Sequence, residues 1–432
     1  MRPARELLAL SAAELARGYK QRSFTPVDVL AALLQAIGED AIHAFVCLDE
    51  RRAMQAARES TERWKRQTPA SGLDGVPVSI KDLVSMAGLP LRRGSLTTPE
   101  TAAAQDAPAV ELLRTGGAVL FGKTSTTEMG SAIHGDSPFH GRTLNPLDPG
   151  RTVGGSSCGA AAQLASGWGP LAVGSDAGGS VRIPASYTGT AAFKPSFGNI
   201  PAWPQSPLVE FAHLGPMART AEDLALAMQV LGQPHRADPA SLYGREGCAP
   251  ARRRPGPLRV GYCARVGGHC TLDDAVAAAW RNLLGRPLHE VWPGQALELV
   301  PVDLEWLDMS EPLWAVWCSR MVETCMGMDE AAQALLGADA VLQYRQGLAA
   351  DGRALALARR DLREAAMRLS TVFAQDIDLL LTPATPGVAP PAGEFADARH
   401  PQYAQWRAAG NWLAATPFSH PFNVTQQPAL VI

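Results

Sequence analysis

Short apolar runs alternate along this chain with segments of helical periodicity, and this alternation constrains the fold more than any other feature. Residues 76–80, 118–121 and 171–174 are short and apolar with glycine close by, as is typical of buried strands. Helical periodicity marks residues 26–37, 51–65, 160–166 and 220–231. We therefore expect an α/β fold, with a mixed, mostly parallel central sheet covered by helices on both faces.

The 432 residues are enough for one large α/β domain spanning 1–432. We expect an N-terminal helical segment at 1–70, a core at 75–232, and the second half of the sheet with its covering helices at 258–432. A Pro-, Arg- and Gly-rich linker is expected at 234–257. In the last part, strands are predicted at 258–262, 297–302 and 377–381, and helices at 273–284, 310–334 and 354–374.

Composition argues against several functional classes. The formal net charge is -3, without the basic surplus that nucleic-acid binding needs. No run of about 18 apolar residues predicts a membrane span, and residues 1–17 lack the apolar centre of a signal peptide. The seven cysteines show no metal or redox spacing. We therefore expect reduced thiols, no metal, no cofactor and a cytoplasmic location.

Two glycine- and serine-rich clusters, residues 154–159 and 174–180, indicate reactive chemistry. Glycine lets backbone N–H groups crowd around a ligand oxygen. The amides of Ala177, Gly178, Gly179 and Ser180 could thus form an oxyanion hole beside the Ser180 hydroxyl. The alternative is two tight turns capped by serines.

A nucleophilic serine needs a base, and none of the nine histidines lies in either cluster. Lys81 follows an apolar strand, where burial would disfavour its charge. A free lysine has a pKa of about 10.4, so it must fall by roughly three units to act as a base near neutral pH. The alternative is a surface lysine paired with Asp82.

Two further motifs match known patterns out of their structural context. Residues 117–124 satisfy the phosphate-loop pattern G-x4-G-K-[ST], but a predicted helix precedes the first glycine and a predicted strand fills the loop. Residues 155–159 satisfy G-x-S-x-G with Ser157 at the centre, but a loop precedes them where that elbow needs a strand. We therefore expect neither nucleotide binding nor an α/β-hydrolase elbow.

The stretch 154–195 resembles the signature of the amidase signature family: Gly-Gly-Ser-Ser, Gly-Ser-Asp-x-Gly-Gly-Ser, Arg-x-Pro-Ala and Lys-Pro follow in order. Residues 75–82 resemble the lysine strand of that family, and 215–219 and 381–386 also match. The resemblance implies an amide hydrolase with Ser180 as nucleophile, Ser156 as bridging residue and Lys81 as base. It also implies a cis bond before Ser156.

The same resemblance suggests Ser157, Asp176 and Arg182 as residues that support the loops. It implies a small-molecule amide substrate and allows a homodimer. Within the family, a free-standing amidase competes with the A-type glutaminase component of a tRNA-dependent amidotransferase. Such components usually have Ser-Leu-Asp-Gln where this chain has residues 210–213, Glu-Phe-Ala-His, and this difference favours the free enzyme.

Two departures from the family pattern stand out. Cys158 replaces a usual glycine, where it could narrow the site or simply pack. The sequence ends at Ile432, inside what resembles a family strand, with Gln426 where glycine is usual. A chain short at this end leaves a non-catalytic binding module as an alternative. Substrate pockets are expected from residues 127–140, 200–215 and 310–345.

Overall fold

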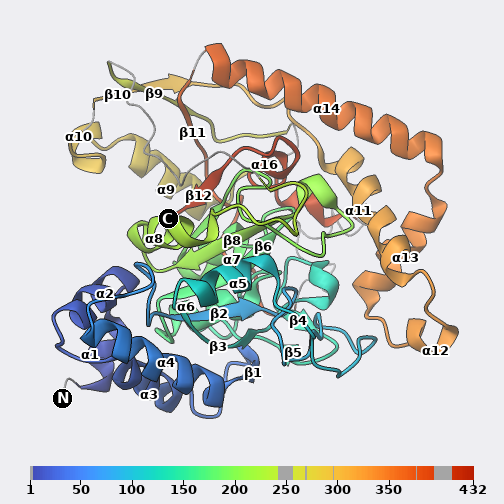
Figure 1. Ribbon diagram of the computed structural model, residues 1–432. Helices are drawn as coiled ribbons and strands as arrows, with labels where there is room; N and C mark the ends of the chain where they lie inside the picture. Colours follow the sequence, from blue (N-terminus) through green and yellow to red (C-terminus); the bar gives the residue numbers. More distant parts are fainter. Residues whose placement is uncertain (1–2, 242–255, 268–269, 295, 376, 394–410) are drawn as a thin grey trace.

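A seven-stranded mixed sheet forms the centre of the protein, in the strand order β1-β3-β2-β6-β8-β7-β12 (Figure 1). The computed structural model describes residues 3–241, 256–267, 270–294, 296–375, 377–393 and 411–432. The strands of this sheet are β1 (Phe45–Leu48), β2 (Pro77–Lys81), β3 (Val119–Thr124), β6 (Leu171–Asp176), β7 (Ala191–Lys194), β8 (His213–Ala218) and β12 (Ala429–Val431). The first three predicted strands correspond to β2, β3 and β6, which are neighbours in the sheet.

Strand directions within this sheet are mixed. β2 is parallel to both β3 and β6, whereas β1 is antiparallel to β3. Further along, β6, β8, β7 and β12 are joined by antiparallel pairings. Because β7 and β6 both oppose β8, four of the seven strands (β2, β3, β6 and β7) share one direction. The predicted α/β fold with a mixed central sheet is confirmed.

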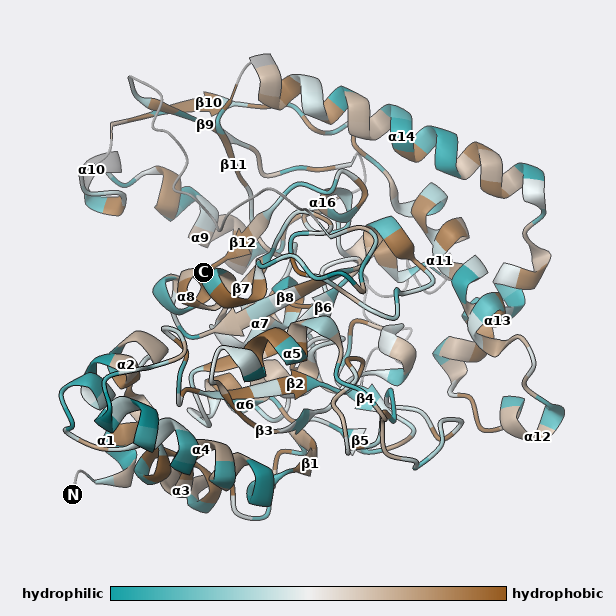
Figure 2. Cartoon of the chain, viewed as in Figure 1, coloured by the Kyte–Doolittle hydropathy of each residue, from teal (hydrophilic) through white to brown (hydrophobic). Residues whose placement is uncertain are grey.

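Helices cover both faces of this sheet. On one face, Val78 and Ile80 pack in a core with α5 (Pro108–Thr115) and α8 (Ala221–Leu231). On the other, Ala172 packs with α6 (Cys158–Ala165) and α7 (Arg182–Thr188). Successive side chains of a strand point to opposite faces of the sheet, so the strands contribute to both of these cores. Figure 2 shows the result, with brown strands lying between helices that are partly teal.

Residues before β2 form a helical layer at one edge of the sheet. It consists of α1 (Ala4–Ala9), α2 (Ala12–Lys20), α3 (Pro26–Ile37) and α4 (Glu50–Lys65), with β1 inserted before α4. Helix α3 begins where the sequence predicts it. The Thr25 hydroxyl accepts from the Asp28 amide at 3.2 Å, and the Asp28 carboxylate accepts from the Thr25 amide at 2.8 Å. This capping box satisfies two backbone donors and fixes the start of the helix.

The part after residue 256 differs from the prediction. β9 (Leu258–Tyr262), β10 (Leu297–Pro301) and β11 (Leu379–Leu381) form a separate parallel sheet in the order β10-β9-β11. The expectation that 258–432 supply the second half of the central sheet is corrected, because of the described strands in this part only β12 joins that sheet. The chain passes through helices from β9 to its neighbour β10, and again through helices from β10 to β11 on the other side of β9.

The helices of this part are α9 (Asp274–Leu284), α10 (Leu288–Val291), α11 (Ser310–Cys325), α12 (Glu330–Gln333), α13 (Ala338–Ala349), α14 (Gly352–Gln375) and α16 (Pro421–Val424). The helix predicted at 310–334 is interrupted at Gly327, whose φ of 89° is incompatible with a right-handed helix. Most of the predicted linker, 242–255, lies outside the described residues.

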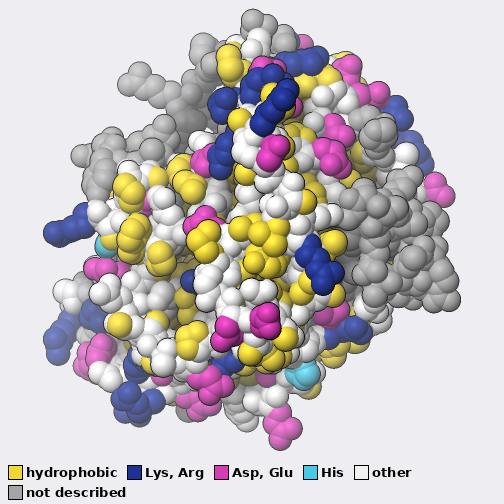
Figure 3. Space-filling view, turned by 90° about the vertical axis from the view of Figure 1, so that its right-hand side faces the viewer, with side chains coloured by type: hydrophobic (Ala, Val, Ile, Leu, Met, Phe, Trp, Pro, Cys, Tyr) yellow, Lys and Arg dark blue, Asp and Glu magenta, His cyan; other side chains and the backbone are white. Residues whose placement is uncertain are grey.

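The other elements are short: β4 (Asp136–Ser137), β5 (Gly141–Arg142) and the 3-10 helices η1 (Glu128–Gly130), η2 (Val209–Phe211) and η4 (Trp412–Ala415). On the face shown in Figure 3, basic side chains gather at the top with acidic ones beside them. Two arginines of α14 form ion pairs, Arg359 with Glu210 and Arg360 with Asp361.

Candidate active site

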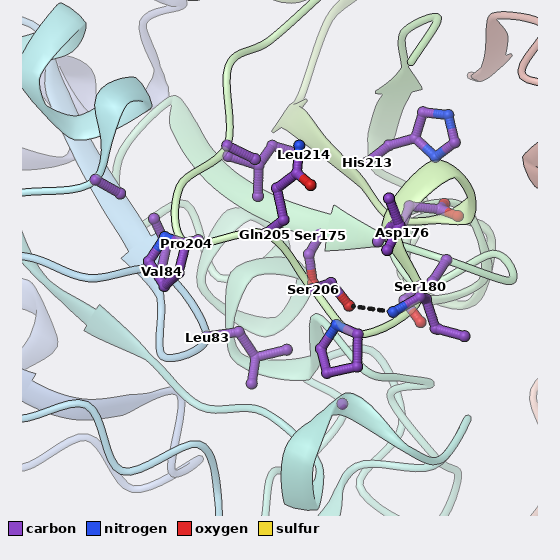
Figure 4. Close-up of a pocket in the computed structure, with 18 of the residues that line it drawn as sticks. Leu83, Val84, Ser175, Asp176, Ser180, Pro204, Gln205, Ser206, His213 and Leu214 are labelled. Carbon is purple, nitrogen blue, oxygen red and sulfur yellow. Dashed lines mark hydrogen bonds between the residues drawn. The ribbon is translucent and has the colours of Figure 1, made fainter. Parts of the chain in front are cut away.

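A cavity of about 310 Å³ opens beside the ends of β2 and β6. These two strands are parallel, so their carboxyl ends meet at one edge of the sheet, where α/β folds place their ligands. Ser156 and Ser180 both line the cavity. Figure 4 shows Ser175, Asp176 and Ser180 on one side of it, and Leu83, Val84 and Pro204 on the other.

Each of the three segments predicted to form substrate pockets contributes to the wall. Met129 and Gly130 come from 127–140, and Trp317 and Arg320 come from 310–345. The largest contribution comes from 200–215, including the turn at the cis bond between Trp203 and Pro204. The cavity lies at the low end of the volume range of small-molecule sites.

Lys81 ends β2 and is fully buried. Its Nζ lies 2.7 Å from Ser156 Oγ, 2.9 Å from Ser157 Oγ and 3.0 Å from Ser175 Oγ. Burial lowers the pKa of Lys81 to about 7, although Cys158 and Asp176 favour its charged form. Its partners are neutral hydroxyls, so a large fraction of Lys81 is uncharged near neutral pH and can accept a proton.

The alternative interpretation of Lys81, a surface lysine paired with Asp82, is wrong. Asp82 instead pairs with Lys123 of β3 at 2.8 Å, and both side chains are fully buried. Lys123 is the lysine of the phosphate-loop pattern, and the structure places it inside a strand. The pattern at 117–124 therefore lacks the open loop that a phosphate needs.

The bond between Gly155 and Ser156 is cis, as the resemblance implied. Ser157 is the N-cap residue of α6, and its amide donates to the Ser180 carbonyl at 3.0 Å. This bond ties the loop that carries Ser156 to the turn that carries Ser180. Among the described residues the two hydroxyls share no direct hydrogen bond; both face the same cavity.

The turn from Asp176 to Ser180 positions the candidate nucleophile. Gly179 has a φ of 123°, which side chains other than glycine rarely tolerate. Its amide donates to Asp176 Oδ1 at 2.8 Å, so the prediction of Gly179 as an oxyanion donor is corrected. In the described part of the chain, the amides of Ala177, Gly178 and Ser180 have no such partner and remain as candidate donors.

Asp176 and Arg182 form the buried support of this turn. Arg182 donates to both carboxylate oxygens of Asp176 at 2.9 Å. It also reaches the C-terminal part, donating to Ser419 O at 2.9 Å and to Asn423 Oδ1 at 2.7 Å. Burial disfavours the ionised form of Asp176, but the charge and hydrogen bonds of Arg182 outweigh it and hold the pKa of that carboxyl well below its usual range. We therefore assign this pair to support.

Sequence reasoning missed several residues of the site. Ser175 contacts Lys81 and precedes Asp176 in the same glycine-rich motif, so its position was a usable signal. Asn423 donates to the Asp176 carboxylate at 2.9 Å, and Ser419 Oγ donates to the Gly178 carbonyl at 2.8 Å. Nothing near Ser419 or Arg320 in the sequence marks them as part of a site.

Cys158 is buried at the start of α6. Its sulfur lies 3.6 Å from Ser125 Oγ and 3.7 Å from Thr143 Oγ1. Burial raises the pKa of this thiol, which keeps it protonated and unreactive at neutral pH. Cys158 does not line the cavity, so packing explains it better than a role in narrowing the site.

Metal-ligand clusters and membrane-spanning helices are both absent from the described residues. These residues contain no group of three or more His, Cys, Asp or Glu side chains placed to hold a metal ion. Among their helices, none combines the length and apolar character needed to cross a bilayer.

The fold and the site together combine a buried lysine, two glycine-rich loops and a cavity at the edge of the sheet. The model of the amidase family matches residues 28–432. An acylamidase of Rhodococcus erythropolis is 30% identical, covering 98% of this chain and 88% of that protein. The A component of the glutamyl-tRNA(Gln) amidotransferase of Thermus thermophilus is 33% identical, covering 89% of this chain and 83% of that protein.

Among solved structures, that of 6-aminohexanoate cyclic dimer hydrolase has a TM-score of 0.82 at 27% identity, covering 98% of this chain and 89% of that one. The chain therefore belongs to the amidase signature family, and it is an amide-hydrolysing enzyme.

Proposed function

We propose that this enzyme cleaves a carboxylic amide through an acyl-enzyme on Ser180, with Ser156 and neutral Lys81 as the proton relay. One observation supports this proposal above the others: Lys81 is buried, has a pKa of about 7 and lies 2.7 Å from Ser156 Oγ. A base of that pKa suits general base catalysis near neutral pH.

The proposed reaction begins with two linked proton transfers. Neutral Lys81 takes the proton of Ser156, and Ser156 takes the proton of Ser180. Ser180 Oγ then forms a bond to the amide carbonyl carbon, and the electron pair of the C=O bond moves onto its oxygen. The amides of Ala177, Gly178 and Ser180 are the candidate donors to that oxygen. Losing one such donor commonly costs about 3–4 kcal/mol of transition-state stabilisation.

Collapse of the tetrahedral intermediate breaks the C–N bond. The leaving nitrogen takes a proton from Ser156, which is reprotonated by Lys81. A water molecule then gives its proton to the same relay and attacks the acyl-enzyme, which releases the acid and restores the Ser180 hydroxyl.

Labelling and kinetics test the nucleophile together. A fluorophosphonate probe should add one covalent mass to the wild-type protein, on the peptide that contains Ser180, and none to Ser180→Ala. The same variant should lose essentially all hydrolysis of a panel of aliphatic, aryl and amino-acid amides. Ser186→Ala is the control, because that hydroxyl contacts Thr385 at 3.2 Å and does not line the cavity. Unchanged hydrolysis by Ser180→Ala would refute the proposal.

A second candidate is the glutaminase component of a tRNA-dependent amidotransferase. The A component from Thermus thermophilus, 33% identical over most of both chains, favours it. The segment Glu-Phe-Ala-His at 210–213 favours the free amidase. Turnover of several amides by the isolated chain, with glutamine among the poor substrates, would support the free enzyme. Turnover of glutamine alone would support the amidotransferase component.

A further inference from the structure

Arg320 is a buried arginine in the wall of the cavity. It lies on α11, is 7% exposed and contacts the face of Trp317 at 4.5 Å from the ring centroid. Its Nη1 donates to the Met129 carbonyl at 3.2 Å. Its Nε and Nη2 are buried and have no acceptor among the described residues. A guanidinium has five N–H donors and is essentially always charged, so most of its bonding capacity is unused.

Arg182 is a second buried arginine with which the missing acceptors of Arg320 can be compared. It is 3% exposed, and all three of its nitrogens donate to Asp176, Ser419 or Asn423. Arg320 has similar burial, yet no carboxylate of the described residues forms an ion pair with it. A buried charge without a partner is costly. Such a cost to stability is expected where a residue is kept in a cavity wall to bind a ligand.

Arg93 lines the same cavity and is linked to Arg320 through one residue. The Met129 amide donates to the Arg93 carbonyl at 2.8 Å, while the Met129 carbonyl accepts from Arg320. The Arg93 side chain donates no hydrogen bond to any described residue. The next residue, Gly130, is so close to the relay that a Cβ there would lie 3.3 Å from Ser156 Oγ. Arg320 and Arg93 therefore line the same cavity as Ser156 and Ser180.

The other ionisable residues of the wall leave this positive charge in place. Asp176 is neutralised by Arg182. Asp238 accepts from the amides of Ala202 and Ala240, both at 2.8 Å, so its carboxylate is already engaged. Burial lowers the pKa of His213 to about 3, which keeps that ring uncharged. Near Met129 the wall thus carries two arginines that form no ion pair within the described chain, and Asp82, whose charge acts on Arg93, is already paired with Lys123.

We propose that the substrate is an amide that carries a carboxylate, and that this carboxylate binds Arg320 with Arg93 nearby. The inference rests on the proposed amide hydrolysis at Ser180 and specifies its substrate class. A carboxylate supplies acceptors for the two nitrogens of Arg320 that lack them, in the fork geometry that guanidinium and carboxylate share. The carboxylate could belong to the acyl half or to the amine half of the substrate.

Paired substrates test this assignment. One pair is the monoamide of a short dicarboxylic acid and the same amide with a methyl ketone in place of the carboxylate. The other pair is an N-acyl amino acid and its methyl-ketone counterpart. We expect wild-type kcat/KM to favour the carboxylate in at least one pair by about 10- to 100-fold, the usual range for a hydrogen-bonded charge. The pair that responds identifies the half that carries the carboxylate.

Arginine variants tie the preference to this residue. Arg320→Met should abolish the preference, and Arg320→Lys should restore part of it, because lysine keeps the charge and loses the fork. Arg265→Gln is the control for removing a guanidinium: it is exposed and pairs with Glu305 away from the cavity. This variant should keep the wild-type ratio. An equal kcat/KM for both members of each pair, or a preference that survives in Arg320→Met, overturns the inference.

A binding measurement separates this inference from the proposed mechanism. In the Ser180→Ala background, the carboxylate amides should raise the melting temperature, and the added Arg320→Met change should remove that shift. If Ser180→Ala hydrolyses amides like the wild type, the mechanism fails. If hydrolysis needs Ser180 but the carboxylate ligands give no shift beyond that of the neutral ones, only the substrate class fails.

Discussion

Replacing Lys81 by methionine should abolish activity and, at the same time, change how the stability of the protein depends on pH. Burial lowers the pKa of Lys81 from 10.5 to about 7. At about 1.4 kcal/mol for each pKa unit, this corresponds to roughly 5 kcal/mol that the buried lysine costs the folded state at low pH. Methionine has similar length and no charge, so Lys81→Met removes this cost.

The sign of the effect follows from proton binding. Between pH 7 and 10.5 the unfolded chain holds a proton on Lys81 that the folded protein has released. The free energy of unfolding of the wild type should therefore rise with pH by about 1.4 kcal/mol per pH unit in this range, relative to Lys81→Met. Below pH 7 both states are protonated and the cost is constant. The Lys81→Met variant also lacks the three hydrogen bonds to serines at every pH. This loss shifts the difference in free energy of unfolding between the two proteins by a constant amount and does not change its slope with pH.

Urea unfolding at pH 7.5, 8.5 and 9.5, for the wild type and Lys81→Met, measures this slope. The difference between the two proteins should change by nearly 3 kcal/mol across the series, in favour of the wild type as pH rises. Lys65→Met, at the exposed end of α4, controls for replacing a lysine by methionine. Wild-type kcat/KM should rise through about pH 7 as Lys81 loses its proton. A difference that does not depend on pH would mean that Lys81 is charged in the folded enzyme, and the relay would fail.

Four further substitutions probe the loops. Ser156→Ala should lower kcat by about 10²- to 10⁴-fold, as expected for the loss of a proton relay. Ser157→Ala should lower kcat less. Steady-state assays of both variants measure this, and a larger loss in Ser157→Ala would mean that Ser157, not Ser156, is the relay. Arg182→Met should destabilise the protein by about 3–5 kcal/mol, because it leaves the Asp176 charge buried without its partner; an unchanged melting temperature would contradict this. Gly179→Ala should abolish probe labelling of the nucleophile, because its φ of 123° and the side chain already facing it exclude a methyl group; normal labelling would show that the turn adapts.

The core of the fold could be predicted because its elements are encoded locally. The apolar runs at β2, β3 and β6 are buried on both faces and are recognisable as strands without reference to other segments. Helix α3 is marked at its start by two local signals, Thr25 as the N-cap and Pro26 in the first turn. The separate sheet of β9, β10 and β11 could not be predicted, because an apolar run does not specify which strand it pairs with.

In the candidate site too, the features encoded locally could be predicted and those that depend on distant segments could not. Ser180 could be proposed from its glycine-rich turn, but its supports lie more than 200 residues away, at Ser419 and Asn423. The depressed pKa of Lys81 needs the whole shell of residues that buries it. Gly179 was assigned to the oxyanion hole because its amide belongs to the same run as its neighbours. Only the structure shows that this amide donates to Asp176.

Arg182 and Arg320 show most directly why residue type alone cannot assign function. Arg182 belongs to a motif, and every nitrogen of its side chain is used to hold the turn of Ser180. Arg320 belongs to no motif; it lines the cavity, and two of its nitrogens have no acceptor among the described residues. The two side chains are chemically identical and similarly buried. The difference in their proposed roles therefore rests on their partners: distant segments provide acceptors for Arg182, whereas two nitrogens of Arg320 have none among the described residues.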